Sequence, residues 1–228
     1  MRWRTVSKTR RPGGIAAGAL AAVLILSGCS DDGQGGREET GTVSPAALKN
    51  CGEVFGERNV EALRADLGKG FQPHDRSLGE MKERMLVEAQ LWNPATDKLA
   101  RTSFHPCQIE GRADGKEAWV IATVGWSKYD VAFVTEGKHA REFREVAKGV
   151  YLDLRQGSDG ARTLVMPCAV PGTRAGQGEN LPLQVSLTDA DRTARSVSTD
   201  QLLKALAEST RELLGCAEKV TVPEKPLS

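Results

Sequence analysis

Apart from Cys29 near its start, the chain has four cysteines, and these constrain its fold more than any other feature of the sequence. Cys51, Cys107, Cys168 and Cys216 are separated by 56, 61 and 48 residues, and none of them forms the closely spaced pair that is typical of a zinc site. In a chain that is exported, an even number of such cysteines predicts disulfide bonds. We therefore expect two disulfides, no metal centre and no free thiol at these four positions.

The first 28 residues indicate that the chain is exported. They contain five basic residues and no acidic one, and an apolar run of 12 residues extends from Ile15 to Leu26. A bilayer core of about 30 Å needs about 20 helical residues to cross it, so this run is too short for a stable transmembrane helix. A basic start followed by a short apolar run is typical of a secretory signal. The basic residues are Arg2, Arg4, Lys8, Arg10 and Arg11.

The residues that close this leader, Leu26-Ser27-Gly28-Cys29, resemble the lipobox of bacterial lipoproteins. The resemblance covers only the leader, and the composition of the whole chain is similar to that of actinobacterial lipoproteins. It implies cleavage before Cys29, attachment of diacylglycerol to the Cys29 sulfur, and acylation, for example with palmitate. Two or three acyl chains on one residue would hold the protein firmly on the extracytoplasmic face of a membrane. The alternative is an ordinary secretory leader with an unpaired thiol at Cys29.

After the leader (1–28) the sequence divides into a tether, one domain and a tail. Residues 29–44 are rich in small and polar residues that cannot bury a core, which predicts a flexible tether. Residues 45–221 suit a single domain, and residues 222–228, with two prolines, predict a loose tail. The leader takes 5 of the 31 basic residues and none of the 30 acidic ones, so the rest is mildly acidic. A mildly acidic chain lacks the positively charged surface that binds nucleic acid.

Helical patterns lie at both ends of the domain and strand patterns in its middle. Apolar residues at helical spacing predict helices near 46–67, 78–91 and 198–214. Runs rich in alternating or β-branched apolar residues predict strands near 102–111, 117–126, 129–135, 150–156, 161–166 and 181–187. We therefore predict an α+β fold, in which an antiparallel sheet has the helices from both ends of the chain packed on one face.

Single residues refine this prediction. Gly52 and Gly56 weaken the first helix, so that a break is expected there. Thr199 is the expected cap of the last helix. Pro182 favours an edge position for the last strand, because proline has no N–H to donate to a neighbour. Residues 138–148 fit a helix, but their high charge also fits an exposed edge or loop.

A weak internal repeat suggests a duplication and bears on the disulfide pairing. Residues 106–111 and 167–172 both read Pro-Cys-x-[Ile/Val]-x-Gly. If the repeat is real, each half has one strand cysteine and one helix-associated cysteine, which favours Cys51–Cys107 and Cys168–Cys216. The rival pairing joins Cys107 to Cys168 and Cys51 to Cys216. Chance is the alternative explanation of the repeat, since Pro, Cys and Gly all mark strand ends.

Aromatic residues in the middle of the chain form the candidate binding surface: Trp119, Trp126 and Tyr129. Trp119 and Trp126 are an odd number of positions apart on one predicted strand, so they should face opposite sides of the sheet. An aromatic side chain on the uncovered side would suit a sugar, peptide or lipid. The alternative is that these rings fill the core, which is the commoner place for large aromatics.

No catalytic, cofactor-binding or metal-binding motif is present, and His74, His105 and His139 are expected to be solvated or packed. We therefore expect a lipoprotein of the cell envelope that is not an enzyme, needs no cofactor, and meets the membrane through lipid on Cys29. Its expected partner is an envelope protein, peptide or glycan. The alternatives are a hydrolase acting on the cell wall, with His74 or His105 as the base, and a structural or assembly partner of an envelope complex.

Overall fold

The computed structural model describes residues 43–68, 70–74, 77–96, 99, 101–155, 160–190 and 196–227. All of these belong to the second of the two units into which the chain divides, residues 39–228. The leader, Cys29 and nearly all of the predicted tether lie outside the described residues.

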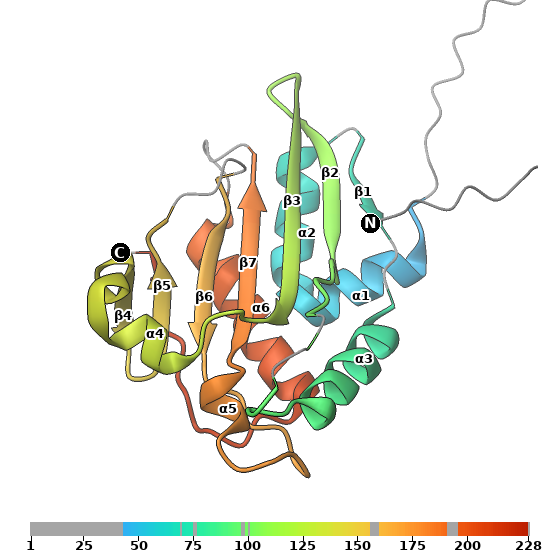
Figure 1. Ribbon diagram of the computed structural model, residues 1–228. Helices are drawn as coiled ribbons and strands as arrows, with labels where there is room; N and C mark the ends of the chain where they lie inside the picture. Colours follow the sequence, from blue (N-terminus) through green and yellow to red (C-terminus); the bar gives the residue numbers. More distant parts are fainter. Residues whose placement is uncertain are drawn as a thin grey trace, which may run out of the picture. The chain divides into compact units, whose positions relative to one another are not determined.

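The described residues form one antiparallel sheet of seven strands in the order β1-β2-β3-β7-β6-β5-β4 (Figure 1). The longest strand, β3, pairs with β7 at the centre, where Val124 lies opposite Val185. The short strands β1 and β4 form the two edges. The bounds are β1 (Gln72–His74), β2 (Gln108–Ala113), β3 (Lys116–Trp126), β4 (Phe143–Ala147), β5 (Val150–Asp153), β6 (Arg162–Met166) and β7 (Leu183–Asp189).

The longer helices come from the two ends of the domain and lie on one face of this sheet (Figure 1). They are α1 (Pro45–Phe55), α2 (Glu57–Leu67), α3 (Leu78–Leu91) and α6 (Thr199–Leu214). The middle of the chain adds three short helical segments: α4 (Val131–Thr135), the 3-10 helix η1 (Gly137–Glu142) and α5 (Gln177–Asn180). The predicted α+β layout is confirmed.

Local side-chain capping explains where three of the four longer helices begin, namely α1, α3 and α6. The Ser44 hydroxyl accepts a hydrogen bond from the Ala47 N–H at 3.4 Å, and the Ser77 hydroxyl accepts one from the Glu80 N–H at 3.1 Å. At α6 the cap is Ser198, in a capping box with Gln201. The prediction that Thr199 caps α6 is therefore wrong; the Thr199 hydroxyl instead donates to Asp189 at 3.1 Å.

The main core lies between the sheet and the long helices. Alternate residues of β3, from Ala118 to Trp126, point to the helices and are buried. A smaller apolar cluster lies on the opposite face, where α4 and η1 cover one end of the sheet. It contains Val134, Phe143 and Val165, with Tyr129, Phe133 and Tyr151 packed against it. The other end of this second face carries no helix (Figure 1).

The structure corrects two strand predictions, one through a local helix cap and one through the strand order. Residues 129–135 were expected to form a strand, but the Asp130 carboxylate accepts a hydrogen bond from the Phe133 N–H at 2.7 Å and begins the helix α4. Strand β7 is central rather than at the edge. Pro182 does not disturb it because the strand begins one residue later, and the Pro182 carbonyl accepts from the Ser127 N–H at 2.8 Å.

The ambiguous segment and the tail also differ from simple expectation. Residues 138–148 are neither one helix nor one edge, because η1 is followed by the edge strand β4. The tail expected to be loose from residue 222 packs against α6. Val222 is 1% exposed, and the Leu227 N–H donates to Asp200 at 2.7 Å.

The structure contains both bonds of the favoured disulfide pairing. Cys51–Cys107 ties α1 to the start of β2, and Cys168–Cys216 ties the segment after β6 to the end of α6. The two Pro-Cys segments nevertheless occupy different positions. Cys107 leads directly into a strand, whereas Cys168 leads into a loop and α5. The repeat therefore does not mark equivalent elements.

Candidate functional site

The helix-free part of the second sheet face presents one large exposed aromatic side chain, Trp119. It lies on β3 and is 39% exposed, and its neighbour directly across on β2 is Glu110. Glu117, two residues earlier on β3, points to the same face and lies opposite Arg112. We call these four residues, Trp119, Glu110, Arg112 and Glu117, the Trp119 shelf.

A hollow of about 350 Å³ adjoins the shelf. Its size falls at the lower end of the range of small-ligand pockets. The tight turn at Asp114 and Gly115, both with positive φ, joins β2 to β3 beside this hollow. The lining residues are Gly70, Glu110, Gly111, Arg112, Glu117, Ala118 and Trp119.

The carboxylate of Glu110 is held in place by two neighbours on the same face. Gln108 Nε2 donates to Glu110 Oε1 at 2.7 Å, and His74 Nε2 lies 3.2 Å from Glu110 Oε2. The latter contact is close enough for an ion pair but lacks the alignment of a hydrogen bond. Two partners from two strands therefore orient this carboxylate on the sheet face that carries Trp119.

The shelf combines one flat apolar ring with charged groups around its edge. Glu110 and Glu117 only accept hydrogen bonds when ionised, and Arg112 only donates them. An indole ring offers a large rigid contact area. This arrangement can stack on a flat ligand face that is partly apolar while binding hydroxyl or amide groups at the ligand's rim.

Trp126 takes no part in this surface. It is 4% exposed, lies on the helix side of the sheet, and its Nε1–H donates to the Met85 carbonyl at 3.0 Å. The prediction that Trp119 and Trp126 face opposite sides is confirmed. The prediction that Trp126 belongs to a binding surface is wrong, because its ring fills the core between β3 and α3.

Tyr129 lies beyond the far end of β3 from Trp119. The seven residue steps from Trp119 to Trp126 alone span roughly 23 Å of strand. Tyr129 stacks on Phe133 with ring centroids 4.4 Å apart, and the Arg155 guanidinium lies 4.5 Å above its ring. Tyr129 is therefore part of the smaller apolar cluster and does not share one pocket with Trp119.

Two cations act on the Tyr129 hydroxyl. Burial raises the pKa of Tyr129, but hydrogen bonding to Lys128 and Arg155, together with their charges, lowers it further than burial raises it. Asp153 fixes Arg155 through both carboxylate oxygens, at 2.8 Å from Nε and 2.5 Å from Nη2. The Asp153 carboxylate in turn raises the pKa of Arg155, which stays charged.

The three histidines lie apart from one another and gather no shared site. His105 Nδ1 is 3.1 Å from the Thr123 hydroxyl, whereas His139 stacks on Phe133 and lies 3.0 Å from Glu142. Within the described part of the chain, no three His, Cys, Asp or Glu side chains gather in a way that could hold a metal ion. Glu110, Arg112 and Glu117 belong to no motif in the sequence, and their alternation with Trp119 on two paired strands was the one signal that pointed to them.

The two disulfides indicate that the folded chain exists in an oxidising environment. None of the helices in the described ranges has the length and apolar character needed to cross a bilayer. Comparison of the chain with protein-family models, with curated proteins and with solved structures gives no match.

Proposed function

We propose that the protein is an extracytoplasmic module, anchored to the membrane by lipid on Cys29, that binds a carbohydrate of the cell envelope at the Trp119 shelf. The observation that carries the proposal is the exposure of Trp119 on the uncovered sheet face, between charged side chains. Sugar rings present both an apolar face that stacks on aromatic rings and a rim of hydroxyl groups. Glu110, Glu117 and Arg112 supply acceptors and donors for that rim.

The anchor is supported by the leader and by the oxidised state of the cysteines. The leader has a basic start, a short apolar run and the lipobox-like sequence ending at Cys29. The disulfides agree with export. The composition of residues 29–44 predicts a tether, and about 15 residues of flexible chain would have a reach of roughly 20 Å, enough to lift the shelf off the lipid headgroups.

A peptide that adds a strand to the sheet is a poorer ligand for this fold. The β1 edge is three residues long and contains Pro73, which has no N–H to offer. The β4 edge carries the exposed charges Arg144 and Glu145 and an irregular register between Glu145 and Ala147. Both edges are therefore poorly suited to strand addition. A sugar bound on the open face needs no backbone pairing.

The carbohydrate proposal is tested by tryptophan fluorescence. Trp92 and Trp126 are 3% and 4% exposed, so among the described tryptophans a surface ligand should change mainly the emission of Trp119. Glycan strands released from digested cell wall should produce a saturable change in the native protein. Isothermal titration calorimetry with the same strands, which does not use Trp119 as its reporter, should show no binding by Trp119→Ala. Leu154→Ala, which removes another exposed apolar side chain (46% exposed), should bind normally. Unaltered binding by Trp119→Ala, or no binding of any envelope glycan, would overturn the proposal.

The anchor is tested separately by mass spectrometry of the protein taken from its own membranes. We expect the first residue to be Cys29 with diacylglycerol on its sulfur, and Cys29→Ser to release the chain into the medium. An N-terminus at another residue, or a bare Cys29 sulfur, would overturn the anchor while leaving the glycan test unaffected.

A further inference from the structure

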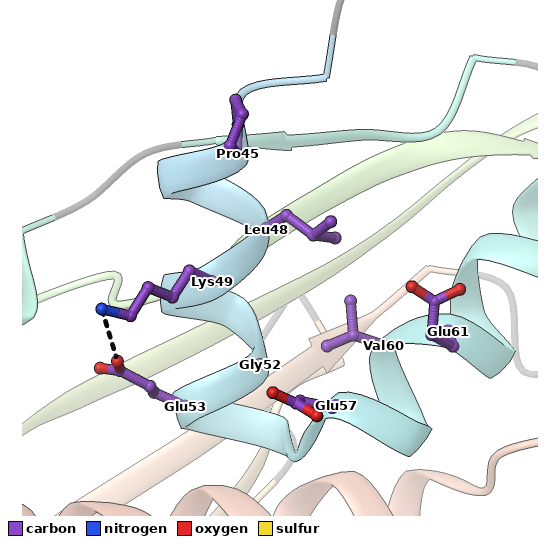
Figure 2. A pocket seen from close by; sticks show the side chains of 8 residues that line it. All are labelled: Pro45, Leu48, Lys49, Gly52, Glu53, Glu57, Val60 and Glu61. Carbon is purple, nitrogen blue, oxygen red and sulfur yellow. Dashed lines mark ion pairs between the residues drawn. The ribbon is translucent and has the colours of Figure 1, made fainter.

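A notch between α1 and α2 lies in the helical layer, on elements that the Trp119 shelf does not use. Gly56, with φ of 84°, ends α1 and begins α2, and its N–H donates to the Gly52 carbonyl at 2.8 Å. The two helices diverge from this elbow and leave a cavity of about 440 Å³ (Figure 2). Its lining residues are Pro45, Leu48, Lys49, Gly52, Glu53, Glu57, Val60 and Glu61.

The notch has an apolar floor. Figure 2 shows Leu48 of α1 and Val60 of α2 extending into the gap between the helices, with Gly52 between them on the α1 side. Val60 is 2% exposed, so its position is fixed by packing. Gly52 adds no side chain. The floor can therefore accept an apolar side chain from outside.

Gly52 is a second observation, independent of the cavity itself, that points to an occupant of the notch. Glycine in a helix interior costs about 0.5–1 kcal/mol relative to alanine. The backbone at Gly52 is ordinary helix, and an added Cβ would meet only the Glu57 side chain and backbone, at 3.5 and 4.0 Å. The fold thus has room for a larger residue at a position where glycine weakens the helix. What glycine provides is the space of the notch.

The notch is also rigid. Cys51, the neighbour of Gly52, is bonded to Cys107 at the start of β2. Val54 and Phe55 of the same helix are buried in the core at 3% and 0% exposure. The wall formed by α1 is therefore held on the sheet, and a ligand would find the notch already formed.

The rim of the notch is acidic, because its negative charges outnumber its positive ones. Its charged residues are three glutamates and one lysine. Lys49 and Glu53 form a pair of 3.7 Å whose side chains are mostly exposed, and such pairs contribute little. Glu61 lies 3.9 Å from Arg64, which is outside the notch. Glu57 makes no ion pair with any residue that the structure describes. The rim therefore complements a cation.

We propose that this notch docks a segment of a partner protein that presents an arginine or lysine next to an aliphatic side chain. The aliphatic side chain lies on Leu48 and Val60, and the cation meets Glu57 and Glu61. A free small molecule fits less well, because the rim carboxylates are exposed and the notch does not enclose its occupant. The proposal goes beyond the glycan-binding function and does not depend on it.

The test uses the disulfide-bonded full chain, labelled with nitrogen-15, and a capped peptide of alternating leucine and arginine. We expect saturable shifts of amide resonances within residues 45–61. The double change Glu57→Gln with Glu61→Gln should weaken binding by about tenfold or more, since charge-assisted hydrogen bonds are lost. Gly52→Leu should abolish binding by filling the floor. Glu83→Gln, an exposed glutamate on α3, and Trp119→Ala should bind normally.

Two further peptides separate the parts of the proposal. Serine in place of leucine, and glutamate in place of arginine, should each remove the shifts. The proposal is overturned if either peptide binds equally well, if the shifts map outside residues 45–61, or if Gly52→Leu and the double glutamine variant bind unchanged. It is also overturned if protein concentration alone shifts these resonances, because a second copy would then occupy the notch. Near-ultraviolet circular dichroism checks that each variant is folded.

Discussion

The guanidinium of Arg211 in α6 donates through Nη1 to the carbonyl oxygen of Pro167 at 2.8 Å, one residue before the disulfide-bonded Cys168. Its Nη2 donates to the Glu218 carbonyl oxygen, and the Glu218 carboxylate accepts from the Ala169 N–H at 2.7 Å. Burial lowers the pKa of Arg211 while the Glu218 charge raises it. One buried charged side chain therefore joins α6 to the segments on both sides of the Cys168–Cys216 bond.

Arg211→Met should destabilise the fold by about 3 kcal/mol, because the Pro167 and Glu218 carbonyls lose their charged donor inside the protein. Urea unfolding measures this as a lower free energy of unfolding. Arg84→Met, an exposed arginine on α3, is the matched control and should change it by less than about 0.5 kcal/mol. Equal effects of the two substitutions would contradict a structural role for the buried guanidinium.

Each disulfide should contribute comparably to stability. The bonds close loops of 56 and 48 residues, which corresponds to about 4 kcal/mol each in the chain-entropy model. Replacing either pair of cysteines by alanine should lower the free energy of unfolding by that order. A reducing agent should lower it in the native protein and leave a variant without the four cysteines unchanged. An unfolding midpoint that is insensitive to reduction would argue against both bonds.

The sequence predicted the long helices because their signals are local, whereas the correct disulfide pairing was favoured by a repeat that the structure does not bear out. Ser44 and Ser77 stand directly before helical periodicity, and a capping residue acts within its own turn. Residues 129–135 were misassigned because their β-branched and aromatic residues resemble a strand, although Asp130 was a valid capping signal. In that segment one hydrogen bond from Phe133 to Asp130 outweighs the strand propensity.

The sequence could predict that the two tryptophans face opposite sides of the sheet, but not which of them is exposed, and the reason is geometric. The odd spacing of Trp119 and Trp126 fixes that they face opposite sides, but a single strand does not reveal which side the helices cover. Strand order decides that, and the central position of β7 depends on pairings with β3 and β6 far away in sequence. Sequence reasoning therefore could not choose which of the two tryptophans is exposed.

The two tyrosines should titrate in separate steps. The chain contains only Tyr129 and Tyr151. The pKa of Tyr129 is lowered from 10.0 by its two cations despite burial, whereas burial and then the Glu145 charge raise the pKa of Tyr151. Absorbance at the phenolate band should show one transition below pH 10 and one above it. Arg155→Gln should move the first transition upward, and a single transition in the native protein would contradict the arrangement.

The same shifts give opposite effects on stability. The lowered pKa of Tyr129 means that the folded state favours the phenolate, so its contribution is present above the unfolded pKa and is lost as pH falls through the folded pKa. The raised pKa of Tyr151 means that its contribution is present below the unfolded pKa and is lost as pH rises through the folded pKa. Tyr151→Phe should therefore reduce the loss of stability at alkaline pH, whereas Tyr129→Phe should increase it. Unfolding curves at several alkaline pH values measure both.

Two glycines should respond to alanine in opposite directions. At Gly52 an added Cβ has its nearest contact at 3.5 Å, so Gly52→Ala should stabilise α1 by about 0.5–1 kcal/mol. At Gly111 an added Cβ would come within 2.7 Å of the Leu67 Cβ and 3.1 Å of the Leu67 carbonyl oxygen, where α2 crosses β2. Gly111→Ala should therefore destabilise the fold by about 1–3 kcal/mol, because α2 must move away from the sheet. Urea unfolding of the two variants and the native protein measures both changes in the free energy of unfolding. If Gly52→Ala were the destabilising one, the notch glycine would be a requirement of the fold, and its value as evidence for an occupant would be lost.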